Sequence, residues 1–369
     1  MPLPSSGSIS LNQMHVEAGG NSGTQCSIND SDIRGLISKS SGAQMSFNEW
    51  YGASSSQSVT MTSGTTINGQ SNRKEQTASS WVSSGDTLII PSNFWLWSDN
   101  TSVAALTIDV NNITVQNNGF IIGRGGDGGS GDNVDGEDGG AAIKINSGVT
   151  GVTITNASGA YIAGGGGGGA SGSSGDAMAG GGGGAGGGAG GDGTGNDVKQ
   201  RYSIGSAPAG GQINAYGDNV GDYDDGGAIG NNNHPNPPIA NVVDAGAGGM
   251  GGHTNYDDVG LGGGSGGRKL GSSAVGGYGP AFTWYSSGSS SYYVSGGGSG
   301  GANNNAGASG GSGSGGGHAA GGGGGWGAAG GGNNENQDPP ASGGAGGAAI
   351  NDSGQTYSLT NNGTIWGST

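Results

Sequence analysis

The feature that most constrains the fold is a set of glycine tracts in the second two-thirds of the chain. They run over residues 123–131, 164–195, 246–267 and 296–332, and glycine makes up 95 of the 369 residues. Ordinary proteins contain about 7% glycine. Because glycine adds no side chain to a core and loses the most conformational freedom on folding, neither a helical bundle nor a conventional mixed domain accounts for this region.

Two structures compete for the glycine-rich region, an ordered scaffold and a flexible linker. Glycine recurs every third residue from Gly166 to Gly193, interrupted only at Met178. Three residues per turn is the polyproline II period. Aromatic side chains such as Trp326 also interrupt the tracts, and flexible linkers usually lack them. These observations favour an ordered scaffold.

A sequence repeat closes the glycine-rich region and favours order further. A Gly-Gly-Ala-Ala-Ile string, followed by Ser-Gly and a β-like run, occurs at 139–148 and again at 346–354. The two β-like runs end alike, at 155–164 and 360–367, and residues 116–123 are an earlier relative. Extended glycine segments can pack side by side through N–H···O and weaker Cα–H···O contacts. We therefore expect a stiff slab with chain reversals and variable loops at its ends.

Residues 1–53 contain three copies of an apolar-Ser-apolar-Asn-acid/amide pattern, beginning at Ile9, Cys26 and Met45. Serine with Gln, Asp or Glu three residues later is typical of a helix N-cap or capping box. The pattern predicts short helices around a small core; ordinary caps in a generic domain are the alternative. The predicted core residues are Met14, Ile33, Leu36, Ile37 and Trp50.

Residues 54–122 have the composition of β-structure, with β-branched and aromatic runs between turn signals. This composition predicts a small sandwich or the start of a solenoid. Trp81, Trp95 and Trp97 are expected to be core residues. The predicted strands cover residues 58–62, 87–90, 94–97, 104–110, 113–116 and 119–122.

Charge and composition exclude several functions. A formal net charge of −16 with ten Lys and Arg argues against nucleic acid, whose binding rests on basic contacts. The single Cys26 excludes an intramolecular disulfide, and the four histidines have no metal-ligand spacing. No apolar stretch reaches 18 residues, so membrane insertion is not expected. We expect no cofactor and no metal.

Binding is predicted to use aromatic side chains in the segments between glycine tracts, chiefly 196–243 and 268–295. Rigid aromatic faces bind at low entropic cost, and loops on rigid scaffolds commonly carry recognition. The alternative is that some of these rings cover the glycine slab as hydrophobic lids. The contact candidates are Tyr202, Tyr216, Tyr223, Trp284, Tyr285, Tyr292 and Tyr293.

The strings at 123–129, 139–145 and 159–169 resemble the distal tail-fibre adhesins of T-even-like bacteriophages. The resemblance covers roughly residues 104–369. It implies a polyglycine II sandwich whose loops recognise outer-membrane proteins or glycans, in a virion protein made in the host cytoplasm. The predicted fold class is accordingly mostly β and irregular: an N-terminal module, a β-strand domain at 54–122, and a polyglycine II bundle with displayed loops at 123–369.

The N-terminal region departs from those adhesins and looks like a module found on assorted phage virion structural proteins. This likeness, over Ser8 to Gly52, implies that residues 1–53 anchor the chain to other virion proteins of the tail fibre, tail or baseplate. Capsid and collar remain open as positions. The anchoring candidates are Leu11, Ile28, Ile33, Phe47, Trp50 and Tyr51.

Other functions fit the sequence less well. A polysaccharide-degrading tailspike needs paired carboxylates on rigid supports, whereas the available acids are adjacent pairs in glycine-rich loops. A calcium β-roll lacks tandem copies, and an ice-binding face lacks regular Thr or Ala between the glycines. We therefore predict an adhesin that binds without catalysis, with a structural decoration fibre as the alternative. The acids considered are Glu137, Asp138, Asp224, Asp225, Asp257 and Asp258.

Overall fold

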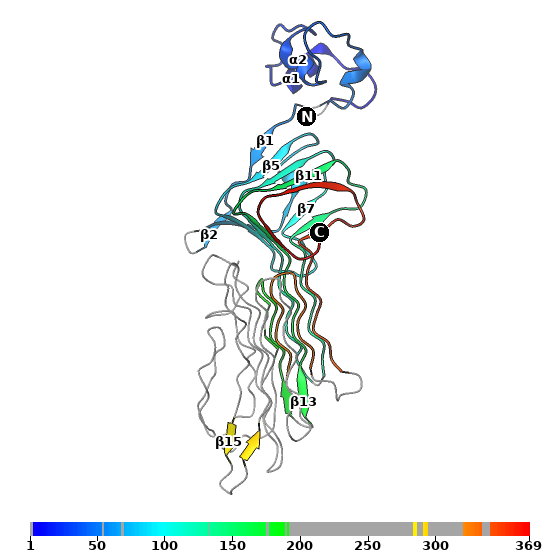
Figure 1. The fold of residues 1–369 in the computed structure, drawn as a ribbon. Helices are drawn as coiled ribbons and strands as arrows, with labels where there is room; N and C mark the ends of the chain where they lie inside the picture. The colour runs from blue at the N-terminus through cyan, green and yellow to red at the C-terminus, as the bar shows by residue number, and fades with distance from the viewer. Residues whose placement is uncertain are drawn as a thin grey trace.

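The chain forms three parts in succession along its length (Figure 1). A module of short helices lies at one end, a β-helix follows, and extended glycine segments project from the β-helix on the side away from the module. The C-terminus lies in the β-helix. The computed structural model describes residues 3–53, 55–67, 70–131, 133–174, 177–188, 190–191, 283–285, 291–293, 320–333 and 340–369.

Helix capping organises the N-terminal module as the sequence pattern predicts. Helix α1 (Leu11–Glu17) begins with a capping box between Ser10 and Gln13, and the 3-10 helix η1 (Phe47–Trp50) begins with one between Ser46 and Glu49. The middle copy of the pattern differs, because its Ser and Asp form a turn: the Ser27 N–H donates to Asp30 Oδ2 over 2.7 Å. Helix α2 (Ser31–Gly35) starts directly after that turn.

The predicted core of this module is confirmed. Met14, Ile33 and Trp50 are fully buried, and Leu36 and Ile37 pack against them. The Trp50 indole N–H donates to the Ile33 carbonyl oxygen over 3.2 Å. The indole therefore ties η1 to the end of α2 within the apolar core.

The β-helix has three sheets, in which all strand pairs are parallel except β2–β3. The first sheet contains β1 (Ser58–Thr60), β5 (Thr87–Ile90), β8 (Thr114–Asn117), β11 (Val152–Asn156) and β18 (Tyr357–Asn361). The second contains β2 (Thr65–Ile67), β3 (Gln70–Lys74), β6 (Phe94–Trp97), β9 (Phe120–Ile122), β12 (Tyr161–Ala163) and β19 (Thr364–Trp366). The third contains β4 (Gln76–Thr77), β7 (Leu106–Ile108), β10 (Ile143–Ile145) and β17 (Ile350–Asn351).

The chain visits the third, first and second sheets in that order on each turn of the β-helix. Each predicted β-run contains a strand, and of the two predicted alternatives the solenoid is the one that forms. Strands β2, β3 and β4 were not predicted; β3 contains no β-branched or aromatic residue, and β4 is only two residues long. Strands from 143–163 and 350–366 join the same sheets, so the sheets continue past the change in composition at residue 122.

The sequence repeat corresponds to successive turns of the β-helix. Ile143 pairs with Ile350, and Asn117, Asn156 and Asn361 follow one another in register. The Asn117 side-chain amide donates to Asn156 Oδ1 over 2.8 Å, and that of Asn156 donates to Asn361 Oδ1 over 2.9 Å. This asparagine ladder satisfies polar groups at a corner of the β-helix, where Asn117 and Asn156 are fully buried.

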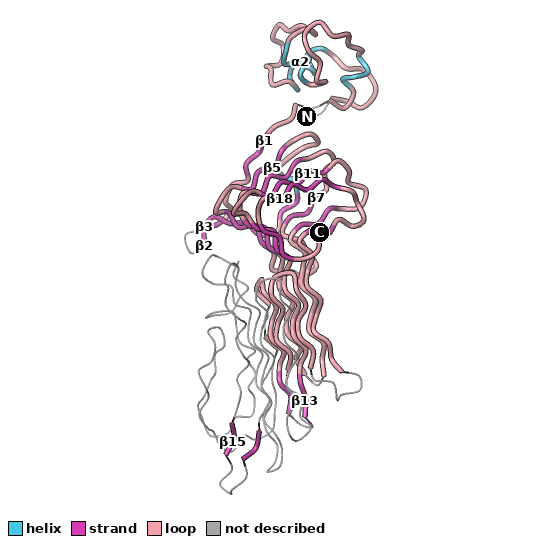
Figure 2. Tube along the Cα trace, viewed as in Figure 1, coloured by secondary structure: helices cyan, strands magenta, loops and turns pink. Residues whose placement is uncertain are grey.

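The glycine segments are excursions from the corner that follows the second sheet. Segment 123–129 leaves β9, and segment 134–140 returns to β10; likewise segment 164–171 leaves β12, and segment 341–347 returns to β17. Figure 2 draws them mostly as loop, yet they run side by side as extended, parallel traces. Their backbone groups bond between segments, as strands do in a sheet.

Segment 164–171 lies at the centre of the described bundle and bonds to its neighbours with a period of three. N–H groups three residues apart donate to the same neighbour, at N···O distances of 2.7–2.9 Å: Gly165 and Gly168 to 134–140, Gly166 and Gly169 to 180–185, and Gly167 and Ala170 to 328–332. Its carbonyl groups accept from 123–129, 320–325 and 341–347. Those six neighbours bond to one another in turn and form a ring around it.

Close approach of the backbones explains why the central segment is glycine. A Cβ atom on Gly165 would lie closer than 3.0 Å to the Arg124 carbonyl oxygen, and one on Gly168 equally close to that of Asp127. Real Cβ atoms do not approach backbone that closely. At these positions only a hydrogen atom fits between neighbouring segments.

An aromatic layer joins the bundle to the β-helix. On the outer face of the second sheet, the Trp95, Phe120 and Tyr161 rings stack with centroids 4.1 and 5.3 Å apart, and Tyr161 stacks on Trp366 at 5.2 Å. Trp326, from the glycine region, is fully buried in the same apolar cluster as Trp95. As predicted, Trp95 is a core residue, and Trp81 and Trp97 pack against the apolar clusters while partly buried. Trp326 covers this layer from the glycine region.

Candidate functional site

At the end of the bundle far from the N-terminal module, the ends of several glycine segments share a polar base. Asn333 is buried, and its side-chain amide donates to Asn133 Oδ1 over 2.6 Å and to the Ser171 carbonyl oxygen over 3.0 Å. The Ala341 N–H donates to both asparagine Oδ1 atoms, and the Val134 N–H donates to Ser171 Oγ over 2.7 Å. We call Asn133, Ser171 and Asn333 the loop base.

The loop base holds together the starting points of three chain reversals. They follow segments 123–129, 164–171 and 328–332, and all three were predicted to interrupt the glycine tracts. One reversal is a two-stranded antiparallel ribbon of β13 (Gly172–Ser174) and β14 (Ala177–Ala179). Figure 1 shows β13 at the far end of the bundle. Because these residues bond to one another, the segment ends that they join have fixed positions relative to the bundle.

Four of the predicted contact residues lie in a second antiparallel ribbon. Strands β15 (Thr283–Tyr285) and β16 (Ser291–Tyr293) pair so that Trp284 stands opposite Tyr292 and Thr283 opposite Tyr293. This ribbon also lies toward the end of the molecule away from the N-terminal module (Figure 1). The other three candidates, Tyr202, Tyr216 and Tyr223, lie outside the described residues.

The acids at the bundle edge stabilise backbone. Asp135 Oδ1 accepts the Ser342 N–H and Asp138 Oδ1 accepts the Ala345 N–H, both over 2.7 Å. At this edge of the bundle the two carboxylates accept N–H groups of segment 341–347, as the carbonyl groups of a neighbouring glycine segment do inside the bundle. The described ranges contain no group of three His, Cys, Asp or Glu side chains that could hold a metal ion. The acids at 224–225 and 257–258 lie outside those ranges.

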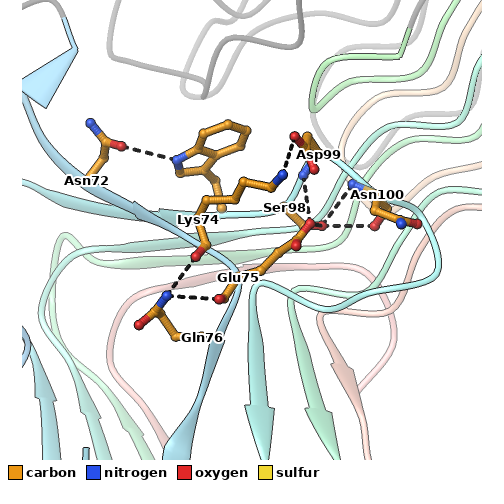
Figure 3. Close-up of polar contacts among 8 residues, drawn as sticks. Asn72, Lys74, Glu75, Gln76, Ser98, Asp99 and Asn100 are labelled. Atoms are coloured by element: carbon orange, nitrogen blue, oxygen red, sulfur yellow. Dashed lines mark hydrogen bonds and ion pairs between the residues drawn. The ribbon is translucent and has the colours of Figure 1, made fainter. Parts of the chain in front are cut away.

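A polar cluster joins the β3–β4 corner to the β6–β7 corner, at two turns of the β-helix that carry no glycine excursion (Figure 3). Lys74 Nζ lies 2.6 Å from Asp99 Oδ2, and this contact raises the pKa of Lys74. The Ser98 hydroxyl donates to Glu75 Oε1 over 2.8 Å, and the Trp97 indole N–H donates to Asn72 Oδ1 over 3.3 Å. The Lys74–Asp99 ion pair and the hydrogen bonds to Glu75 tie the two corners together.

A buried arginine lies where the first glycine segment leaves the β-helix. Arg124 Nη2 is 2.8 Å from Asp127 Oδ1, and Asp99 and Glu137 add negative charge nearby. Burial lowers the pKa of the Arg124 guanidinium, and these carboxylates partly offset that effect. Arg124 therefore balances acidic groups at the top of the bundle.

The anchoring candidates divide by burial. Ile33 and Trp50 are fully buried in the module core, and Leu11 and Ile28 are partly buried against it. Phe47 is 55% exposed and Tyr51 37% exposed. A partner can thus reach Phe47 and Tyr51 directly, whereas Ile33 and Trp50 support the surface that carries them.

A comparison with protein families identifies the chain. The model of the family described as phage tail fibre adhesin Gp38 matches residues 44–258, which is more than half of the sequence. The chain belongs to this family. It is a bacteriophage tail-fibre adhesin, and its place is the tail fibre of the virion.

Two further comparisons accompany the Gp38 family match. A crystal structure of the gp37-gp38 adhesin tip complex of the bacteriophage S16 long tail fiber matches with a TM-score of 0.42 and 16% identity, over 96% of each chain. No curated protein sequence matches this adhesin. No helix among the described residues of the adhesin is long and apolar enough to cross a membrane.

Sequence reasoning missed the loop base of the adhesin. Asn133, Ser171 and Asn333 lie up to 200 residues apart in the chain, and each was read as part of a loop. One sequence signal could have indicated them: each of the three is a polar residue at the end of a glycine segment, where the three-residue glycine period stops. The asparagine ladder was signalled by the repeat that contains it.

Proposed function

We propose that this adhesin is held on the virion by its N-terminal module, residues 1–53, and binds a host surface protein or glycan with loops at the other end of the molecule. The observation that carries the proposal is the placement of these parts. The module and the chain reversals lie at opposite ends, with the β-helix and glycine bundle between them (Figure 1). Such an arrangement separates attachment to the fibre from contact with the cell.

We infer that the glycine bundle is a packing of polyglycine II helices. The period of three in the hydrogen bonds of segment 164–171 supports this assignment, because each N–H then points to one of three neighbours in turn. The six surrounding segments match the number that a threefold helix can bond to, three through its donors and three through its acceptors. A bundle of this kind is stiff, since every segment is cross-bonded along its length.

The loop base supports recognition by the loops that it holds. Ordering a loop on binding costs conformational entropy, and a fixed base reduces that cost. The pairing of β15 with β16 limits the freedom of the aromatic segment in the same way. We propose that the segments 196–243 and 268–295 bind through the candidate aromatic residues named above, from Tyr202 to Tyr293, and that they bind without catalysis, while the loops held by the loop base form the rest of the same end of the molecule.

The partner of the N-terminal module is inferred to be another tail-fibre protein. Phe47 and Tyr51 present exposed aromatic surface, and aromatic residues are enriched at the centres of protein interfaces. Tyr51 is also fixed in place, because its hydroxyl donates to the Gly7 carbonyl oxygen over 2.5 Å. The limits of the anchoring module, residues 1–53, and the display of the binding loops by the glycine-rich region 123–369 are part of this proposal.

The test compares three forms of the full chain for binding to candidate host cells and for assembly with the fibre. In the first variant, short Gly-Ser links replace 196–243 and 268–295; in the second, Phe47→Ser and Tyr51→Ser are combined. We expect the first variant to lose saturable cell binding while still joining the fibre. We expect the second variant to keep cell binding and to fail to join the fibre. Saturable binding that survives the loop replacement would refute the placement of the binding site.

A further inference from the structure

The outer face of the first sheet of the β-helix carries two straight rows of side chains, mostly hydroxyl-bearing. Along each strand, residues alternate between a buried inner face and an outer face that is partly or fully exposed. Strand pairing places the outer residues in register. One row contains Ser58, Thr87, Thr114, Thr153 and Ser358; the other contains Thr60, Ile89, Gln116, Thr155 and Thr360. We call these ten residues the hydroxyl face.

Strand pairing makes the hydroxyl face a regular array of side chains. Neighbouring strands in a sheet lie about 4.8 Å apart, and alternate residues of one strand about 6.6 Å apart. Five strands therefore extend each row over about 19 Å along the β-helix axis. Eight of the ten side chains carry a hydroxyl group, and among the described residues none of the eight hydroxyls has a hydrogen-bond partner in the protein.

The charge of the protein restricts what can lie on this face. The chain has a formal net charge of −16, yet neither row contains a charged side chain. The overall negative charge repels anionic polymers, while the face itself offers no charge to a cationic one. Serine and threonine hydroxyls both donate and accept hydrogen bonds, as sugar hydroxyls do.

We propose that the hydroxyl face binds an extended polysaccharide of uncharged sugars, lying along the axis of the β-helix. A row of about 19 Å contacts several sugar units at once, so weak contacts add along the chain. This site is separate from the loops at the end of the bundle. It keeps the adhesin in reversible contact with a neutral surface glycan while the loops find their receptor.

The test is electrophoresis of the full chain in native gels that contain dextran, mannan or galactan, with alginate as the anionic comparison. The test variant combines Thr87→Val, Thr114→Val and Thr153→Val, which remove hydroxyls and keep β-branched side chains. The matched control combines Thr77→Val and Thr107→Val, a pair in register on the third sheet. Thermal melting of each variant checks that the fold is retained.

We expect at least one of the three neutral polysaccharides to retard the adhesin, and the test variant to bind it about tenfold more weakly, as the loss of several modest hydrogen bonds predicts. The control variant and the loop-replaced variant should both be retarded like the unaltered chain, which separates this site from the proposed receptor site. Lack of retardation in all three neutral gels overturns the proposal. Unchanged retardation of the test variant, or equal retardation by alginate, does so as well.

Discussion

Replacing Gly168 by alanine tests whether the glycine bundle is packed as described. Gly168 lies in the central segment, where its N–H donates to the Glu137 carbonyl oxygen and its carbonyl accepts the Gly344 N–H, each over 2.8 Å. An added Cβ would meet the Asp127 carbonyl oxygen closer than 3.0 Å. Because the obstacle is backbone, relief requires two segments to move apart.

The cost of Gly168→Ala follows from these contacts. Overpacking of a close-packed interior costs about 1–3 kcal/mol, and weakening two backbone hydrogen bonds costs about 0.5–1.5 kcal/mol each. Together these terms lower the free energy of unfolding by roughly 2–6 kcal/mol. At about 2–4 °C per kcal/mol for a unit of 150–250 residues, a loss in the middle of that range lowers the Tm by roughly 8–16 °C.

Calorimetry measures this change, and hydrogen exchange of the bundle amides locates it. The matched control is Gly35→Ala, because a Cβ at Gly35 meets no atom within 4 Å. We expect the control to melt like the unaltered chain, and the Gly168 variant to melt earlier with faster exchange in the bundle. Equal melting and exchange of the two variants would refute close packing around the central segment.

Three further predictions follow from single contacts. Asn156→Ala breaks the buried asparagine ladder and should cost about 1–3 kcal/mol in denaturant unfolding, whereas Asn362→Ala, at an exposed neighbour, should cost little; equal costs would contradict the ladder. Ser46→Ala removes one cap of the N-terminal module and should lower its stability by about 1 kcal/mol, measured by circular dichroism. Hydrogen bonds from Lys39 and the Ser46 backbone lower the pKa of Glu49 from 4.5 in the folded protein. The contribution of ionised Glu49 to the free energy of unfolding is therefore complete above pH 4.5, and it is lost as the pH falls through the lower pKa of the folded state. Glu49→Gln should flatten this part of the pH–stability profile, and an unchanged profile would show that the contact is not formed.

Local patterns were sufficient to predict much of the fold. The capping boxes at Ser10 and Ser46 depend on residues three apart, and the strands of the β-helix follow from short β-branched runs. The sequence did not predict strand β3, because its residues are all polar. Pairing with β6 holds that strand in place, and such pairing leaves no mark in the strand's own residues.

The site was predictable only in part, for the same reason. Trp284 and Tyr292 were chosen from composition, and the structure brings them opposite each other in one ribbon. The loop base, by contrast, joins Ser171 to Asn133 and Asn333 across most of the chain. No pattern near any one of these residues indicates the other two.

The sequence by itself determined that the glycine tracts of this adhesin have almost no side chains with which to form a core, so that their order must come from backbone hydrogen bonds. It also determined, through the repeat, which residues occupy equivalent turns of the β-helix. Only the tertiary structure decided which glycine segments are neighbours. The physical reason is that every glycine offers the same N–H and C=O groups, so the partners of Gly168 depend on where the β-helix starts and ends each excursion.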